Sequence, residues 1–213
     1  MQTRENPLKI NEIEGDCTMK KLLCLLLAMT MLMGSLFILS ACDEKDKKDK
    51  DDEEESTEEV VASAPDVPKG YALYENDHIY FVYPEKWTPN SLGDNAGALI
   101  LDGTTGNNIT AVGEVYSNIY KDMTVESFNS LIKPSLDGQG LSVSGVKISQ
   151  VKNARNTELT KISYTVKNAT GTSMKQTIYV VASGDLNYAI NVTEVKSVSG
   201  LLDTVFNSIV AKK

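Results

Sequence analysis

The chain holds few side chains that could take part in covalent or acid–base chemistry. It has one histidine, His78, and three cysteines, at positions 17, 24 and 42. His78 stands close to Glu75 and Asp77, and these three side chains could in principle ligate a metal ion. Zinc sites usually draw a further ligand from a distant part of the chain, and none stands out here. A nucleophile–histidine arrangement would have to use the same histidine. We interpret His78 as a surface-turn histidine and expect neither a metal site nor catalytic residues.

The glycines do not form a nucleotide-binding loop. Gly103 and Gly106, and later Gly138 and Gly140, lack the further glycine and the strand-to-helix setting that such loops require. The oxygen-rich segment 102–108 does not follow the ligand order of a calcium-binding loop, and we interpret it as a hairpin tip. We therefore expect no cofactor.

Cys42 is chemically distinctive because of the residues around it. Two lysines precede an apolar stretch from Leu22 to Leu39, and two small residues follow it. A positive start, an apolar stretch and small residues are the parts of an export signal. The run Leu39-Ser40-Ala41-Cys42 resembles the lipobox of bacterial lipoproteins. The resemblance implies that the Cys42 thiol receives a diacylglyceryl group and that a peptidase cuts before it, which makes residues 1–41 a signal peptide.

The lipoprotein resemblance also implies a location. Acyl chains such as palmitate would anchor the mature chain at the extracytoplasmic face of a bacterial membrane, since two or more chains hold stably where one does not. An uncleaved transmembrane helix is the alternative, but the apolar stretch, 18 residues long, lies at the lower edge of a spanning length. Residues 1–18 carry two basic and four acidic side chains, which is atypical of a signal, so Met19 is our preferred start. A genuine long leader is the other possibility.

An acidic segment follows Cys42. Residues 43–59 contain eleven acids, four lysines and no apolar residue, for a net charge of −7. Such a segment cannot bury enough surface to offset its ordering entropy, so we expect residues 42–69 to be a disordered, lipid-anchored spacer. A binding site for cations or a basic partner is the alternative interpretation. Residues 60–213 carry 14 acids and 13 bases, and this near-neutral sum argues against nucleic-acid binding and against adhesion to anionic lipids through a polybasic face.

Residues 70–213 are long enough for one domain, and their patterning predicts the α+β class. An apolar helical stripe of Phe128, Leu131, Ile132 and Leu136 follows the capping candidate Thr124, and Pro134 should end or kink that helix near Lys133. A second stripe, from Leu201 to Val210, predicts a C-terminal helix. Strands are expected at 79–83, 98–101, 109–116, 141–151 (irregular), 159–167, 174–182 and 186–195. The expected architecture is one antiparallel sheet with both helices packed on it.

The start of this domain, Ile79-Tyr80-Phe81-Val82-Tyr83-Pro84-Glu85-Lys86-Trp87, resembles the PsbP/Mog1-like superfamily, whose members often open with a strand running into a Tyr-Pro-x-x-Trp turn. The resemblance implies an α/β/α sandwich around an antiparallel sheet. Characterised relatives bind proteins, as photosystem accessory subunits or as a partner of a nuclear-transport GTPase, and the family has no shared catalytic residues. Together with the export signal and the spacer, this resemblance implies a non-catalytic accessory module of the cell envelope, with an envelope protein as partner.

Aromatic residues gather at the start of the domain and offer an alternative function. Tyr80, Tyr83 and Trp87 could form a binding surface for a protein, a glycan or a small ligand. Rings on strands more often belong to the core, and we prefer that interpretation for Trp87. An envelope hydrolase that uses His78 or an acidic pair is the remaining alternative.

Overall fold

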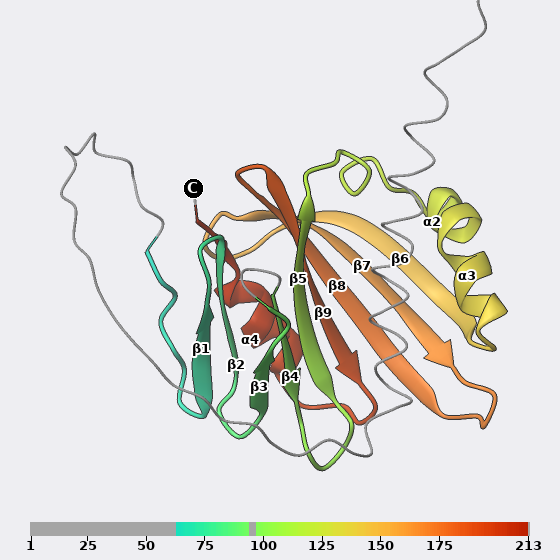
Figure 1. Ribbon diagram of the computed structural model, residues 1–213, viewed down its shortest axis with the longest axis horizontal. Helices are drawn as coiled ribbons and strands as arrows, with labels where there is room; N and C mark the ends of the chain where they lie inside the picture. Colours follow the sequence, from blue (N-terminus) through green and yellow to red (C-terminus); the bar gives the residue numbers. More distant parts are fainter. Residues whose placement is uncertain (1–62, 94–96, 213) are drawn as a thin grey trace, which may run out of the picture.

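A computed structural model describes residues 63–93 and 97–212 of the protein. The expected signal peptide, Cys42 and the acidic run 43–59 lie outside these residues. Within them, the strands form two antiparallel sheets (Figure 1). Seven strands pair in the order β3-β4-β5-β9-β8-β7-β6, and three pair in the order β1-β2-β10. The bounds are β1 Tyr71–Glu75, β2 Ile79–Pro84, β3 Thr88–Ser91, β4 Gly97–Leu101, β5 Asn108–Val115, β6 Ser142–Lys152, β7 Glu158–Lys167, β8 Ser173–Ser183, β9 Leu186–Glu194 and β10 Val210–Ala211.

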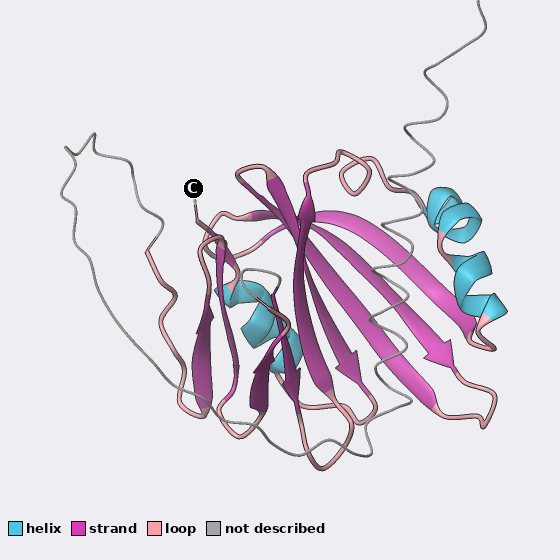
Figure 2. Ribbon diagram, viewed as in Figure 1, coloured by secondary structure: helices cyan, strands magenta, loops and turns pink. Residues whose placement is uncertain are grey.

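The helices cover the two faces of the larger sheet. They are α2 Val125–Leu131, α3 Lys133–Gly138 and α4 Leu201–Ser208. Figure 2 shows α2 and α3 together at the β6 end and α4 at the other end, beside β2. Phe128, Ile132 and Leu136 pack with Ile162 and Ile178 on one face. On the opposite face, the three-stranded sheet and α4 close over β4, β5, β8 and β9. This is the α+β arrangement that the sequence predicted.

The internal helix begins and breaks where the sequence indicated. The Thr124 side chain accepts from the Ser127 N–H at 3.2 Å, and Ser127 Oγ accepts from the Thr124 N–H at 2.8 Å. This reciprocal pair satisfies two of the donors that a helix start leaves free. Ile132 ends α2, and α3 starts at Lys133 with Pro134 in its first turn, so the expected break is confirmed.

The C-terminal helix is shorter than its apolar stripe. It ends at Ser208, and Ile209 is extended, with φ −66° and ψ 124°. Val210 and Ala211 then pair with Tyr80 and Ile79 of β2. Ser208 Oγ donates to the Val205 carbonyl at 2.7 Å and accepts from the Val82 N–H at 2.9 Å, which ties the helix end to β2. The expected single sheet is therefore two sheets, because the last residues complete a separate three-stranded one.

The close approach of β4 to β5 requires a glycine at position 97. Its φ is +130°, and a Cβ there would lie 1.8 Å from the carbonyl oxygen of Ala111 on β5. We expect Gly97→Ala to lower the free energy of unfolding by about 3 kcal/mol, because both the backbone angle and the contact with β5 must change. Urea denaturation measures this.

Gly138→Ala is the matched control, because Gly138 lies in α3 and a Cβ added there would meet no atom within 4 Å. That variant should stay within about 1 kcal/mol of the native chain. Equal stability of the two variants would contradict the assignment of Gly97.

Candidate functional site

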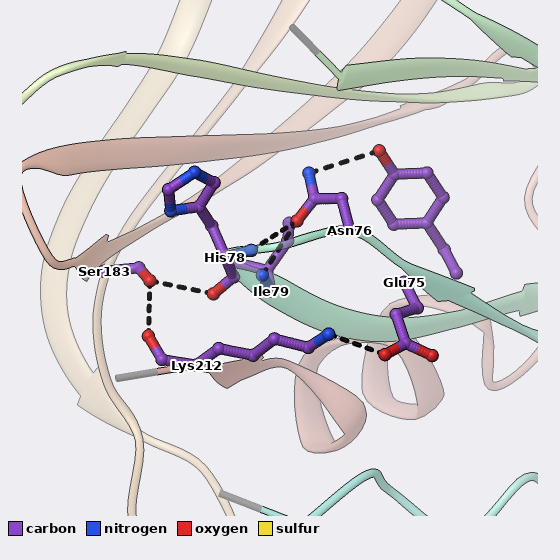
Figure 3. Close-up of polar contacts among 7 residues, drawn as sticks. Glu75, Asn76, His78, Ile79, Ser183 and Lys212 are labelled. Atoms are coloured by element: carbon purple, nitrogen blue, oxygen red, sulfur yellow. Dashed lines mark hydrogen bonds and ion pairs between the residues drawn. The ribbon is translucent and has the colours of Figure 1, made fainter. Parts of the chain in front are cut away.

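The turn between β1 and β2 gathers the residues around His78 (Figure 3). Asn76 Oδ1 accepts the backbone N–H groups of His78 and Ile79, each at 2.9 Å. This side chain therefore shapes the turn, as Asn commonly does. The half-buried His78 ring stacks on Tyr188, with ring centroids 5.4 Å apart. The turn histidine expected from the sequence is present, and it packs against β9.

The C-terminus closes over the same turn. Ser183 Oγ lies 2.8 Å from the His78 carbonyl oxygen and 2.6 Å from that of Lys212. The Lys212 N–H donates to the His78 carbonyl at 2.7 Å. The Lys212 ammonium donates to Glu75 Oε1 at 2.6 Å and lies 4.1 Å from the ring centroid of Tyr80. The hydrogen bond from Lys212 lowers the pKa of the Glu75 carboxyl.

These contacts decide what chemistry the turn can do. Glu75 points to Lys212 rather than to His78, so the sequence neighbours do not form a ligand set (Figure 3). Across residues 63–93 and 97–212, no three His, Cys, Asp or Glu side chains are placed to hold a metal ion. The polar groups here hold backbone segments together, which is a structural role.

A groove of about 560 Å³ opens beside this turn. Tyr74, Glu75 and Asn76 line one side, and Pro89, Asn90 and Ser91 of β3 line the other. Gly97 and Ala98 of β4 complete the wall. The groove thus lies where the three-stranded and seven-stranded sheets meet without pairing. It combines apolar rings with amide, hydroxyl and carboxylate groups, which suits a polypeptide segment or a small polar molecule.

Within residues 63–93 and 97–212, the strand that borders this groove has a free edge. β3 is terminal in its sheet, and all four of its residues are exposed. The Leu92 N–H donates to the Gly97 carbonyl at 3.0 Å, and Asn90 is in register with Leu99. Hydrogen-bonded and non-bonded pairs alternate along an antiparallel ladder, so the backbone groups of Pro89 and Ser91 point away from β4. The Pro89 carbonyl and the Ser91 N–H and carbonyl are therefore available to another strand.

Tyr80, Tyr83 and Trp87 do not form one binding surface. Side chains alternate between the two faces of a strand, so Tyr80 and Tyr83 of β2 point in opposite directions. Tyr80 lies under the Lys212 ammonium, whereas Tyr83 packs against the core. Trp87 is 8% exposed and belongs to the core itself. The core interpretation of Trp87 is confirmed, and the ring is unavailable for stacking on a ligand.

Comparison with solved structures shows the fold. The chain is similar to cyanobacterial PsbP (CyanoP) from Synechocystis sp. PCC 6803, with a TM-score of 0.50 and 13% identity, over 71% of this chain and 99% of that one. The domain has a PsbP-like fold. At this identity the likeness concerns the fold alone.

Two further solved structures are more distant. One is a protein of Bacteroides thetaiotaomicron VPI-5482, with a TM-score of 0.41 and 14% identity over 63% of this chain and 45% of that one. The other is LpqN, described as involved in cell envelope biogenesis of Mycobacterium tuberculosis, with a TM-score of 0.40 and 11% identity over 67% of this chain and 91% of that one. No family model and no curated protein matches the sequence. Within the described part of the chain, no helix has the length and apolar character needed to cross a membrane.

The PsbP-like domain also holds a titratable group that its sequence does not reveal. Glu114, near the end of β5, shares the sheet face that carries α2 and α3, and Oε1 of its carboxyl is buried with no hydrogen-bond partner among the residues that the structure describes. Burial raises the pKa of this carboxyl, although a hydrogen bond with Tyr120 opposes the rise. Nothing in the local sequence distinguishes Glu114 from an exposed strand glutamate, because its burial comes from the loop that leads to α2.

This raised pKa makes the stability of the PsbP-like domain depend on pH. A carboxyl with a higher pKa in the folded than in the unfolded chain stabilises the fold when protonated, and loses that contribution as pH rises through the folded pKa. Glu114→Gln should therefore unfold at higher urea than the native chain at pH 8. Its advantage should shrink as the pH falls towards the unfolded pKa of the carboxyl. An advantage that stays constant or grows on acidification would contradict the burial of an ionised Glu114.

Proposed function

We propose that the chain is a lipid-anchored protein of the extracytoplasmic face of a bacterial membrane, whose PsbP-like domain is a non-catalytic module that binds an envelope protein. The lipobox-like run ending at Cys42 supports the anchor and the location. The acidic segment that follows supports a spacer between the membrane and the domain. The fold of the domain is compatible with an accessory role.

One observation carries the binding proposal: the free edge of β3 faces a groove. An extended segment of a partner can join such an edge as an additional strand, with main-chain hydrogen bonds for affinity and side-chain pockets for specificity. The Pro89 carbonyl and the Ser91 N–H and carbonyl offer three hydrogen bonds. Alternate side chains of the partner would then enter the groove beside Tyr74 and Asn76.

The contacts around His78 support a non-catalytic role for the domain. The side chains nearest to it in the sequence shape the turn or pair with the C-terminus, as Asn76 and Glu75 do. Ser183, the hydroxyl closest to this turn in the hydrogen-bond network, is held by two backbone carbonyls rather than by the imidazole. A nucleophile activated by histidine would need a hydrogen bond between hydroxyl and ring.

Lipid attachment at Cys42 is tested by metabolic labelling. Cells fed an alkyne fatty acid should incorporate the label into the native chain, and the labelled chain should sediment with membranes. Cys42→Ser should abolish the label, because only a thiol can form the thioether. Cys24→Ser, which alters a cysteine inside the apolar stretch, should leave labelling unchanged. Label that persists in Cys42→Ser, or that never appears on the native chain, would overturn the anchor.

The β3 edge is tested by a pair of substitutions at one residue. Ser91→Pro removes the outward N–H but spares the bonds to β4, whereas Ser91→Ala keeps that N–H. With a photoreactive residue at position 88, irradiation of intact cells should give an adduct with an envelope protein. Ser91→Pro should reduce the adduct yield by about fivefold, since one hydrogen bond of about 1 kcal/mol is lost, and Ser91→Ala should not reduce it.

Unfolding midpoints of the two variants should agree, which separates binding from stability. Equal adduct yields from Ser91→Pro and Ser91→Ala would contradict strand addition at β3. An adduct that forms only when the photoreactive residue stands at position 149 on β6 would place the partner at the other edge of the sheet.

A further inference from the structure

The basic residues of the domain are concentrated in three neighbouring strands. Residues 142–183, which span β6, β7 and β8, contain six basic side chains and a single acid, Glu158. Their net charge is +5, whereas residues 60–213 as a whole carry −1. Because β6, β7 and β8 lie side by side at one end of the larger sheet, these charges share one region of the surface (Figure 1).

Strand register places four of the lysines on a single sheet face. Lys161 is opposite Tyr179, which packs under α4, so Lys161 belongs to the α4 side of the sheet. Lys147 is opposite Ser163, two residues along β7 from Lys161, and therefore shares that side. The same alternation places Lys175, opposite Thr165, and Lys167, opposite Ser173, on it. We call Lys147, Lys161, Lys167 and Lys175 the lysine face.

The lysine face is accessible, and two carboxylates, those of Glu194 and Asp203, lie at its edge near Tyr179. Lys147, Lys167 and Lys175 are exposed, and Lys161 is half-buried with its ammonium 5.6 Å from the Tyr179 ring centroid. Among the described residues, none of the four forms an ion pair. The carboxylate nearest in register is Glu194, opposite Lys175, and its Oε1 accepts the Val198 N–H at 3.1 Å.

The shape of the lysine face suits a linear polyanion rather than a single anion. Lys161 and Lys167 stand six residues apart on β7, which corresponds to roughly 20 Å along a strand. Ser163 and Thr165 lie between them on the same face and can donate hydrogen bonds to anionic oxygens. An extended chain of carboxylates matches this stripe, because same-side positions along an extended chain repeat at the same spacing as those of the strand.

A polyanion of this kind is part of the same protein, at residues 43–59 with net charge −7. The chain enters the domain beside the β6–β7 turn, where Asp66 pairs with Arg155 at 3.5 Å. Asp66 follows Glu59 by seven positions, a length of chain that can reach at most about 24 Å. The end of the acidic segment nearest the domain, Glu59, is therefore within reach of the lysine face. As a tethered ligand, the segment is present at a high effective concentration.

We propose that the acidic segment 43–59 docks on the lysine face of the same molecule. The contact is electrostatic and reversible, so it weakens as added salt shortens the screening length. While docked, the segment covers the lysine face and shortens the reach of the tether; when it is released, both become available together. This proposal does not depend on lipid at Cys42 or on a partner at β3. The experiments on docking, lipid attachment and strand addition can therefore give independent results.

The test measures how fast each lysine reacts. The full chain, purified as the cell produces it, is treated with a limiting acetylating reagent, and mass spectrometry gives the rate at every lysine. A second chain has the eleven acids of 43–59 replaced by the corresponding amides, a change outside the folded domain. At low salt, the lysine face should react about threefold more slowly in the native chain than in the amide variant, because the contact is unscreened. The difference should vanish at high salt.

Exposed lysines elsewhere on the domain serve as internal controls, at positions 86, 121 and 196. Their rates should be nearly equal in the two chains. A carbodiimide should also form zero-length links between acids of 43–59 and the lysine face in the native chain, and dilution should not reduce their yield.

Three results would overturn the proposal. One is equal reaction rates at the lysine face in the native and amide chains. Another is slowing of the control lysines by the same factor, which would indicate a diffuse charge effect. The third is binding of the native chain to vesicles of anionic phospholipid through the lysine face at physiological salt, with equal affinity for the amide variant. That result would identify the lysine face as a membrane-binding surface.

Discussion

The architecture depends on the return of the C-terminus to the β1–β2 turn. β10 completes the smaller sheet, and the Lys212 N–H and the Ser183 hydroxyl both reach the His78 carbonyl. The end of α4 is held in the same way, since Asn153 Nδ2 donates to the carbonyls of Phe206 at 2.9 Å and Ile209 at 2.8 Å. Leaving such buried carbonyls without donors would cost about 1–3 kcal/mol each. A few polar side chains therefore hold the smaller sheet and α4 against the larger sheet.

The groove and the free edge follow from this closure. Because β2 pairs with β1 and the short β10, it does not pair with β3, and β3 remains terminal in the larger sheet. Edge strands invite association, and natural proteins limit it with short strands and proline. β3 has four residues and contains Pro89. Its edge can therefore pair with a short extended segment but cannot support the addition of a long strand or a further sheet. The groove beside it adds side-chain selectivity to that main-chain contact.

The sequence predicted most of the strands, including the irregular one that forms β6, but it missed β1, β3 and β10. Alternation identified β7 and β9, and the capping residue Thr124 with Pro134 located α2 and its break. β1 lacks a regular alternation, β3 has no apolar residue, and the short apolar run at Ile209 fits helix and strand equally well. The groove, the buried carboxyl of Glu114 and the split into two sheets depend on contacts between distant segments. His78 could be placed in a turn, whereas its stacking on Tyr188 of β9 could not.

The net charge of a sequence does not predict how charge is distributed over the surface of the folded protein. The near-neutral total of residues 60–213 predicted no polybasic face, yet strand pairing gathers Lys147, Lys161, Lys167 and Lys175 on one side of three strands. At physiological salt the screening length is about 8 Å, so an approaching group responds to the charges within its neighbourhood rather than to the total. The acids that balance these lysines lie mostly in residues 60–141, on other elements. The acidic segment 43–59, with net charge −7, and the lysine face are therefore oppositely charged parts of one chain. The length of chain between them, rather than the net charge of the protein, determines whether they can come into contact.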